Sequence, residues 1–417
     1  MRIFVYFIAA LAVIGVAHAQ TPPPVEAFGR LPVIADAAMS PDGSKVAMIA
    51  TDEDGAAAIV VHDLDRAQRV FGVMGPREGQ LRGVGWASDT QVSFLISRAV
   101  APGAVLPFNM RYRGAPSRVE FWRNGIADLE TERVRLLSTS DEVWEDRASE
   151  LIAPIEGDPG MGRMIGRAQG QQASHPTIYR VRFDGGNAQV VAPRGVNRDT
   201  IDFLLDARGQ TIARIDSDER TNRWSIFVYD GEIPRLLMQD TSATGDPLSL
   251  VGALPDGRLV AVDEGEGEFF ALHAIDRTTG AREVLFQREG IEVDGIIRDP
   301  WTREIVGAAW IEEEARQEFF DPALRAAQQH IQTLFQGGVI NVISWSRDRR
   351  RLLLYGERSL DGGAYYYHTV GEDRVVRLSH LYPQVAEARI GERQSITYRA
   401  RDGVRVPAYL TLPRGGA

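Results

Sequence analysis

The residues of this chain that could do chemistry form no known catalytic pattern. Serine hydrolases with an α/β fold carry their nucleophile in a Gly-x-Ser-x-Gly turn, and the sequence contains no such turn. The histidines lack the H-x-x-x-H or H-E-x-x-H spacing that brings two imidazoles to one metal ion. They are scattered along the chain at His18, His62, His175, His273, His330, His368 and His380. We therefore predict no catalytic, metal-binding or cofactor-binding residues in this chain.

Two runs of carboxylates concentrate negative charge. Residues 263–268 read DEGEGE and residues 312–314 read EEE, but neither run has the D-x-D-x-D-G spacing of a calcium-binding loop. We interpret both runs as solvated charge on turns. An alternative for Glu312, Glu313 and Glu314 is recognition of the cationic amino terminus of a peptide.

Composition and charge exclude several classes of function. The chain has 417 residues, of which 44% are hydrophobic and 25% charged, as in globular proteins. Its formal net charge of −10 excludes a nucleic-acid partner, which needs a concentrated basic surface. Lys45 is the only lysine, so no phosphate-binding loop ending in Gly-Lys-Ser/Thr is present. Without cysteine, neither disulfides nor thiol chemistry is available.

Residues 1–19 have the pattern of a secretory signal peptide. Arg2 precedes the apolar run Ile3–Val16, and Ala17-His18-Ala19 provides a cleavage pattern before Gln20. The apolar run is shorter than the roughly 20 residues that span a bilayer, so we expect cleavage rather than a retained membrane anchor. The mature chain would then be periplasmic or secreted, would have no membrane attachment and would lack His18.

A strand–turn–strand unit with an aspartate in its turn occurs seven times. The first copy is MSPDGSKVAMIA at residues 39–50, and later copies follow at intervals of roughly 45–50 residues, with one longer step of about 70. A period in this range is typical of β-propeller blades, which need neighbours to bury their faces. The seven turn aspartates are Asp42, Asp89, Asp158, Asp206, Asp256, Asp299 and Asp348.

Most units continue into a second hairpin, as at residues 56–73 and 364–380. We therefore predict an all-β fold, a seven-bladed β-propeller over residues 33–390, preceded by an N-terminal segment at 20–32. The alternative, an unrepeated β-sandwich, does not explain seven evenly spaced turns. No spare strand is evident that would complete another blade. We expect the ring to close by apolar contact between the first blade and the last.

Two insertions interrupt the repeat. Residues 98–130 mix aromatic residues with arginines and are interpreted as a solvated loop or edge cover, or alternatively as part of a substrate vestibule. Residues 319–338 predict one inserted helix, because Asp321 suits its N-cap, Pro322 its first position and Gly337 its end. Leu324, Ala327, Ile331, Leu334 and Phe335 fall on one face of this helix, whereas His330 lies off that face and is expected at the surface.

The chain ends with a further hairpin pattern. Ile396, Tyr398 and Ala400 alternate on one side of the Asp402-Gly403 turn, and Val406, Ala408, Leu410 and Leu412 alternate on the other. Such a hairpin needs a surface on which to bury its apolar face. The sequence stops at Pro413–Ala417 without an obvious one.

The order of these segments resembles the prolyl-oligopeptidase family of serine peptidases, most closely its exported bacterial acylaminoacyl-peptidase and dipeptidyl-peptidase-like members. The resemblance covers about residues 27–413 and rests on AFGRLPVIADAAMSPDGSKVAMIA, RDPWTREIVGAAW, FFDPALRAAQQHIQTLF, VISWSRDRRRLLLYGE and YRARDGVRVPAYLTLP. It implies that residues 391–417 are the start of an α/β-hydrolase domain that is truncated here. The family's serine, aspartate and histidine would lie downstream, so none maps onto this chain.

Two functions remain open from the sequence. In the first, the chain is the propeller portion of an exported serine peptidase that acts on peptides, and it limits access to the catalytic domain, its partner in the intact protein. In the second, it is a stand-alone periplasmic propeller that binds a partner without catalysis. The terminal hairpin favours the first, because a free-standing propeller does not need it.

Overall fold

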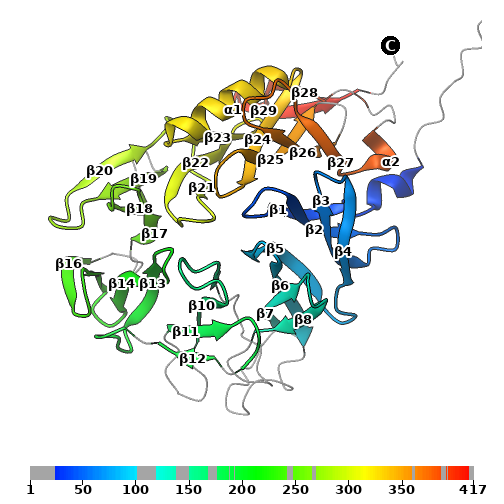
Figure 1. Ribbon diagram of the computed structural model, residues 1–417. Helices are drawn as coiled ribbons and strands as arrows, with labels where there is room; N and C mark the ends of the chain where they lie inside the picture. Colours follow the sequence, from blue (N-terminus) through cyan, green and yellow to red (C-terminus); the bar gives the residue numbers. More distant parts are fainter. Residues whose placement is uncertain are drawn as a thin grey trace, which may run out of the picture.

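The strand–turn–strand units fold into seven small antiparallel sheets arranged as blades around a common axis (Figure 1). The structure, a computed structural model, describes residues 24–100, 119–137, 150–167, 176–186, 188–191, 193–241, 248–264, 269–358, 362–386, 391 and 393–412. The predicted signal peptide with its cleavage site before Gln20, residues 101–118, His175 and Pro413–Ala417 lie outside the described residues. The prediction of a seven-bladed β-propeller with one inserted helix is confirmed.

Each blade is a meander in which consecutive strands pair with one another. In chain order, blade 1 contains β1 (Ile34–Met39), β2 (Lys45–Thr51), β3 (Ala57–Asp63) and β4 (Gln68–Met74), and blade 2 contains β5 (Gln80–Ser88), β6 (Gln91–Val100), β7 (Val119–Asp128) and β8 (Arg133–Leu136). Blade 3 contains β9 (Glu150–Ile152), β10 (Met161–Arg167), β11 (Pro176–Arg182) and β12 (Gln189–Val190), and blade 4 contains β13 (Thr200–Leu205), β14 (Thr211–Asp218), β15 (Arg223–Tyr229) and β16 (Pro234–Thr241). Blade 5 contains β17 (Ser249–Ala253), β18 (Leu259–Glu264), β19 (Phe270–Ile275) and β20 (Arg282–Phe286). Blade 6 contains β21 (Gly295–Arg298), β22 (Ile305–Ile311) and β23 (Ala315–Phe319), and blade 7 contains β24 (Gly338–Trp345), β25 (Arg351–Arg358), β26 (Ala364–Thr369) and β27 (Val376–His380).

The repeated aspartates lie in the turns between the first and second strands of the blades. In blade 1, Ser40 Oγ donates to Asp42 Oδ1 at 2.6 Å, and in blade 7 Ser346 Oγ donates to Asp348 Oδ1 at the same distance. Both serines are almost fully buried, so these aspartates satisfy hydroxyls that water does not reach. Gly43 has φ of +74°, and a Cβ there would lie 2.9 Å from Cβ of Ser346. Glycine is therefore required where the first blade meets the last.

Helix α1 (Pro322–Leu334) follows the third strand of blade 6 and begins where the sequence predicted. The Asp321 side chain accepts hydrogen bonds from the N–H groups of Ala323 and Leu324, each at 2.9 Å. Gly337, at φ of +76°, turns the chain just beyond the helix. The predicted apolar stripe is confirmed, since Leu324 and Ile331 are buried together with Phe335 against blade 7.

Blade 6 has three strands in the described residues rather than the four of the other blades, a difference that the repeat did not predict. The helix follows β23 where a fourth strand would be, and Figure 1 shows it at the rim beside β23. Phe335 packs edge-on against Tyr366 of blade 7, with ring centroids 5.3 Å apart. An amphipathic helix buries apolar surface against the next blade as a strand would.

Three glutamines occupy the edge of β24 that faces away from β25. Gln328 Nε2 donates to the carbonyl of Ile340 at 2.6 Å, and Gln332 Nε2 donates to that of Gly338 at 2.9 Å. From β23, Gln317 both donates to the carbonyl of Val342 at 2.8 Å and accepts from its N–H at 3.0 Å. An open strand edge is thus satisfied by side chains instead of a neighbouring strand.

The first insertion is shorter than the sequence predicted. β6 and β7 form one continuous ladder from the pair Gln91 and Asp128 to the pair Val100 and Val119. Residues 98–100 and 119–128 are therefore strand of blade 2, and only 101–118 remain as insertion. The mixture of aromatic residues and arginines concealed the alternation of buried and exposed side chains along β7. Phe121 is buried, whereas Trp122 on the opposite face stacks under Arg82.

Within the described residues, the ring closes without a strand shared between its ends. Blade 1 consists of β1–β4 and blade 7 of β24–β27, and no described strand crosses between the two sheets. Ile34, Met39 and Val46 of blade 1 pack with Leu353 and Tyr365 of blade 7 in one apolar cluster. This confirms the expected apolar closure. We call this junction of blades 1 and 7 the seam.

Hydrogen bonds supplement the apolar contact along the seam. The N–H of Val33 donates to the carbonyl of Leu381 at 2.9 Å, and that of Arg347 donates to the carbonyl of Pro41 at 2.8 Å. Ser344 Oγ accepts from the N–H of Met39 at 3.1 Å. The seam therefore has backbone contacts at both of its ends.

An arginine joins blades 6 and 7 in a similar way. Arg349, in the aspartate turn of blade 7, donates to the carboxylates of Asp299 and Asp321, both at 2.7 Å. Asp299 is almost fully buried and also accepts from the indole N–H of Trp345 at 3.3 Å. One cation thus connects the turns of two blades to the cap of α1.

In the described part of the chain, neither α1 nor α2 (Pro383–Ala386) is long and apolar enough to cross a membrane.

The packing of α1 gives a first prediction. Replacing Phe335 by Ala should destabilise the protein by about 3–5 kcal/mol, because a buried ring is removed and its cavity cannot collapse between helix and sheet. The free energy of unfolding from urea denaturation would measure this. Gln329→Ala, at an exposed position of the same helix, should change stability by less than about 0.5 kcal/mol. Equal losses in both variants would contradict the packing described.

The cap of α1 gives a prediction about pH. The Asp321 carboxyl is partly buried, which opposes ionisation, but the N–H groups of α1 and the Arg349 guanidinium outweigh this and lower its pKa below the ordinary value of an aspartate. Its contribution to stability is therefore complete above the ordinary pKa and is lost as pH falls through the lower folded-state pKa. Asp321→Asn keeps the cap but removes the charge. The wild type should melt higher than this variant at neutral pH, and the difference in Tm should vanish in strong acid. A difference that persists unchanged in acid would contradict the role of the charge.

Candidate functional site

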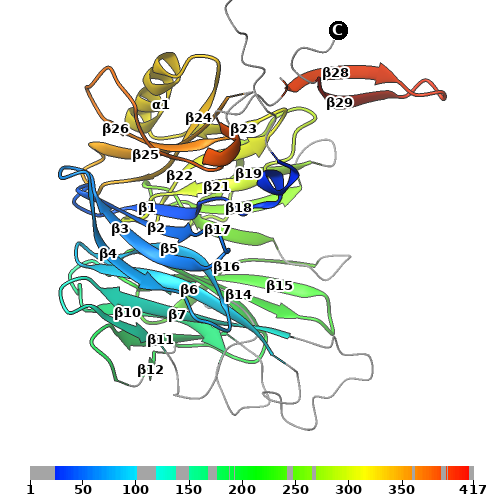
Figure 2. The ribbon, with the colours of Figure 1, turned by 90° about the vertical axis from the view of Figure 1, so that its right-hand side faces the viewer.

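The terminal hairpin forms as predicted and stands off one face of the ring. β28 (Arg393–Arg399) pairs with β29 (Arg405–Thr411), and Gly403 at φ of +87° makes the tight turn. Figure 2 shows the hairpin projecting from the ring. We call the side from which it projects the hairpin face. The N-terminal segment, with its short 3-10 helix η1 (Val25–Gly29), joins β1 on this face, next to the residues that follow blade 7.

The hairpin exposes the apolar residues that the sequence placed on it. Ile396 is 36% exposed and Tyr398 is 52% exposed, while Leu410 and Leu412 on the other strand are 39% and 49% exposed. A two-stranded sheet without a covered face is only marginally stable in water. The hairpin therefore depends on its contacts with the ring or on a further surface.

The hairpin is attached to the ring through the middle residue of the EEE run. Ser395 Oγ donates to Glu313 Oε1 at 2.6 Å, and the Tyr409 hydroxyl donates to the main-chain carbonyl of Glu313 at 2.9 Å. Arg393 adds an ion pair with Glu357 at 3.5 Å. These two glutamates receive all the hydrogen bonds and ion pairs from the hairpin to the ring in the described residues.

The other two glutamates of the run are engaged within blade 6. Glu312 accepts from the indole N–H of Trp310 at 3.1 Å, and Glu314 pairs with Arg316 at 3.3 Å. The N–H of Glu312 donates to the carbonyl of Glu314 at 3.2 Å and closes the turn between β22 and β23. The run thus lies on a turn, as predicted. Its contact with the hairpin could not be predicted, since Ser395 lies 82 residues further along the chain.

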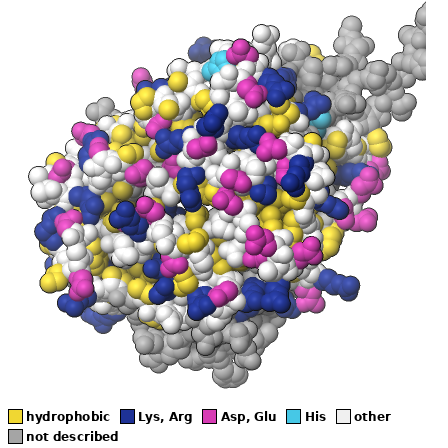
Figure 3. Space-filling view, viewed as in Figure 1, with side chains coloured by type: hydrophobic (Ala, Val, Ile, Leu, Met, Phe, Trp, Pro, Cys, Tyr) yellow, Lys and Arg dark blue, Asp and Glu magenta, His cyan; other side chains and the backbone are white. Residues whose placement is uncertain are grey.

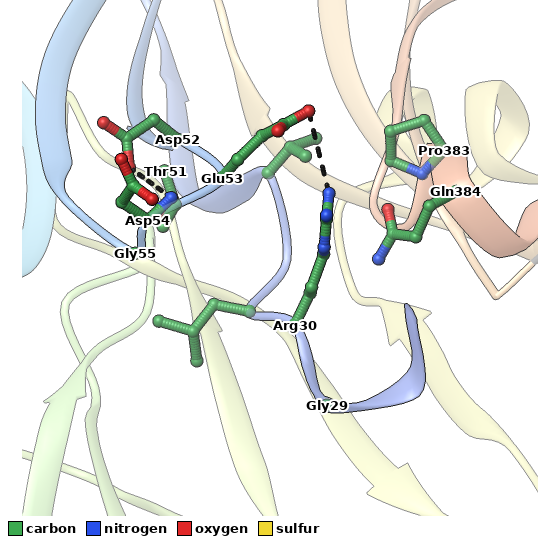
Figure 4. A pocket seen from close by; sticks show the side chains of 11 residues that line it. Gly29, Arg30, Thr51, Asp52, Glu53, Asp54, Gly55, Pro383 and Gln384 are labelled. Atoms are coloured by element: carbon green, nitrogen blue, oxygen red, sulfur yellow. Dashed lines mark hydrogen bonds and ion pairs between the residues drawn. The ribbon is translucent and has the colours of Figure 1, made fainter. Parts of the chain in front are cut away.

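A cavity of about 670 Å³ opens beside the seam on the hairpin face (Figure 4). Its walls come from the turn between β2 and β3, from the N-terminal segment and from the residues after blade 7. Asp52 shapes the turn by accepting from the N–H groups of Asp54 and Ala56 at 3.0 and 2.8 Å. Gln384 fixes the far wall by donating to the carbonyl of Ala27 at 3.2 Å.

The cavity is acidic. Asp52, Glu53 and Asp54 contribute three carboxylates, and Arg30 is the one cation among the lining residues. Arg30 and Glu53 are 3.7 Å apart and both largely exposed, so their attraction is weak. This cavity could not be predicted from the sequence, because its walls come from segments more than 300 residues apart.

On the opposite side of the ring, the described residues form no patch of a single charge. In Figure 3 arginine and carboxylate side chains are interspersed across it. The aspartate turns contribute to this mixture, for instance through the pair of Arg258 and Asp256 at 2.8 Å. The view shows no concentrated basic surface of the kind that nucleic acids need.

The histidines that the structure describes do not gather into a site. His330 is 42% exposed and lies 3.4 Å from the carboxylate of Asp373, with its ring 5.9 Å from that of the buried His368. His368 Nδ1 lies 2.9 Å from the carbonyl of Arg374. No group of three potential metal ligands was found among the residues that the structure describes.

The fold is a seven-bladed β-propeller, and solved structures of several peptidases are similar to it. The chain is similar to a prolyl endopeptidase, with a TM-score of 0.57 and 11% identity over 92% of this chain and 55% of that one. It is also similar to the acylaminoacyl peptidase of Pyrococcus horikoshii, with a TM-score of 0.51 and 11% identity over 92% and 58% of the two chains. For the post-proline cleaving enzyme of Rickettsia typhi, the TM-score is 0.51 and the identity 10%, over 90% and 57% of the two chains.

These similarities establish the fold alone, and the chain spans somewhat more than half the length of each of these three peptidases. No protein-family model matches the sequence, and comparison with curated proteins gives no match. The resemblance inferred from the sequence motifs is thus confirmed at the level of structure.

The attachment of the hairpin gives a third prediction. Replacing Ser395 by Ala and Tyr409 by Phe removes both hydrogen bonds to Glu313, so trypsin should cut within β28 and β29 about fivefold faster. Mass spectrometry of the released peptide would measure this. Tyr398→Phe is the control, because that hydroxyl makes no hydrogen bond within the described residues. Equal cleavage rates in the double variant and the wild type would show that these contacts do not hold the hairpin.

Proposed function

We propose that this chain is the substrate-gating propeller of an exported serine peptidase of the prolyl-oligopeptidase family. The catalytic serine, aspartate and histidine belong to an α/β-hydrolase domain that is not part of this chain, and that domain is its partner. The substrates are peptides. The shared fold and the fraction of the known peptidases that the chain spans support this proposal.

One observation carries the proposal: the terminal hairpin leaves the ring on the same face as the N-terminal segment, beside the seam. Val33 and Leu381, which bound the ring, are joined by a backbone hydrogen bond of 2.9 Å. A domain continuing from the exposed apolar hairpin would therefore lie over the hairpin face (Figure 2). There it would cover the strip that includes Ile396 and Tyr398.

A propeller in this position acts on access rather than on bond chemistry. Its blades are packed sheets that do not deform easily. Extended peptides can pass such a barrier, whereas folded proteins cannot. The ring would thereby bring short, flexible chains to the catalytic groups and would exclude bulk water and large substrates.

The location follows from the first residues. Arg2, the apolar run and Ala17-His18-Ala19 direct export, with cleavage before Gln20, so the protein would act in the periplasm or outside the cell. The sequence has no cysteine, so the folded protein depends on packing alone. This is compatible with an oxidising compartment.

The fourth prediction concerns the gene product in its host. An antibody raised against this chain should detect a protein longer than 417 residues that reacts with a serine-directed fluorophosphonate and begins at Gln20. The 417-residue chain by itself should neither react nor cleave aminoacyl or acyl-peptide substrates. Detection of an unreactive exported protein of about this length would instead support the alternative, a stand-alone binding propeller.

A further inference from the structure

Two arginines lie opposite each other within blade 3. In the ladder of β10 and β11, Arg163 is the direct partner of Arg180. Like charges at such positions repel each other, because the Cβ atoms are only about 5 Å apart. Asp158, in the aspartate turn of the same blade, pairs with Arg180 at 3.4 Å, but the two side chains are 44% and 42% exposed and their attraction is weak. Two cations therefore share one carboxylate.

Arg163 has few partners for its charge. Its Nη1 donates to the carbonyl of Gly162 at 3.3 Å, its Nε is buried without a hydrogen-bond partner, and it forms no ion pair with the residues that the structure describes. A guanidinium has five N–H donors, and a partly buried arginine is normally paired. Burial and the Arg180 cation lower the pKa of Arg163, against a smaller opposing effect of Asp158. The fold thus leaves one cation unneutralised at this point.

This cation borders a cavity of about 820 Å³ between blades 3 and 4, on the side of the ring that carries the aspartate turns. Gly209 lines the cavity and packs closely on Arg163, since a Cβ at Gly209 would lie 2.5 Å from Arg163 Cγ. Ile178 also lines the cavity and lies on the same face of β11 as Arg180, two positions further along. The apolar part of the lining consists of Ile178, Val191, Pro193 and Ile212.

The other carboxylates near the cavity are already engaged. Asp206 accepts hydrogen bonds within its own turn, from the N–H groups of Arg208 and Gln210, both at 2.9 Å. The remaining ones form ion pairs of 3.1 Å, which are Glu156 with Arg208, Asp230 with Arg277 and Glu232 with Arg194. A ligand would therefore meet one uncompensated positive charge beside an apolar surface, and not a broad basic patch.

We propose that Arg163 and Arg180 bind the carboxylate of a ligand whose apolar part lies in this cavity. A guanidinium donates two parallel hydrogen bonds to a planar carboxylate. The single negative charge of a carboxylate balances the one unneutralised cation, whereas the nearby Asp158 and Asp206 would repel a phosphate dianion. The site lies on the side of the ring opposite the hairpin face, so it does not rest on the proposed function.

The first test titrates the 417-residue chain with N-acetylleucine, which has a carboxylate and an apolar side chain, and with its neutral amide. Calorimetry should give a Kd for the acid about tenfold lower than for the amide, because the amide cannot form charge-assisted hydrogen bonds with the arginines. An amidated leucyl-aspartate dipeptide tests the other source of the carboxylate, and tighter binding of either acid than of the neutral amide supports the site. Equal Kd values for all three compounds, or no binding, overturn it.

The second test uses variants of the same chain. Arg163→Gln should weaken the binding of N-acetylleucine about tenfold without lowering Tm, because the fold does not neutralise this cation, whereas the loss of a structural arginine would lower Tm. Arg180→Gln, at an exposed position, should weaken binding in the same way. Arg182→Gln is the matched control, since Arg182 lies on the same face of β11 but is paired with Asp184.

Two outcomes of the second test contradict the site. Wild-type affinity in both Arg163→Gln and Arg180→Gln overturns the role of the two arginines. Tighter binding of inorganic phosphate than of N-acetylleucine overturns the assignment of the site to a carboxylate.

Discussion

The packing of blade 1 against blade 7 is the constraint on which the rest of the structure depends, because no strand that the structure describes is shared across the seam. At this contact, burial disfavours the ionised forms of two side chains, Tyr365 and Asp36. Burial raises the pKa of Tyr365 to about 12, helped by Asp36 and Tyr355, and burial also raises the pKa of Asp36 against the hydrogen bonds it accepts from Val84 and Ala37. The contribution of Asp36 to stability is complete at pH values below the ordinary pKa of an aspartate. It is lost as the pH rises through the raised pKa that Asp36 has in the folded protein. The seam relies on its apolar cluster and on the backbone hydrogen bonds at its ends.

How far the sequence predicts this structure depends on the range of the interactions involved. The turn of Asp42 and Gly43 was recognisable because its serine, aspartate and glycine act within a few residues. The cap of α1 was recognisable for the same reason. The three-stranded form of blade 6 was not recognisable. The glutamines that hydrogen-bond the backbone of β24 give no periodic pattern in the sequence, and β24 belongs to another blade. The role of Glu313 and the cavity near Asp52 were equally hidden, because their partners are distant in the chain.

Charge divides the hairpin face into two parts. The hairpin carries Arg393, Arg399, Arg401 and Arg405 with Asp402 as its one carboxylate among the described residues, although the chain as a whole has a formal charge of −10. The cavity beside the seam is acidic by contrast. A domain lying on this face would meet basic and acidic surfaces side by side. Such an arrangement determines the orientation of the bound domain more than its affinity for the ring. Exposed charges guide the two surfaces together, and like charges that meet in a wrong orientation repel each other.

Both departures from a regular propeller, the helix and the hairpin, meet at blade 6. The turn that carries Glu313 leads directly into β23, in which Arg316 pairs with Glu314 and the next residue, Gln317, bonds the backbone of β24. The hairpin is therefore attached next to a short strand that is joined to blade 7 through side chains. The seam lies on the other side of blade 7, where separate contacts close the ring. The hairpin is thus attached beside the interface between blades 6 and 7, which α1 and Arg349 reinforce, and away from the contacts that close the ring.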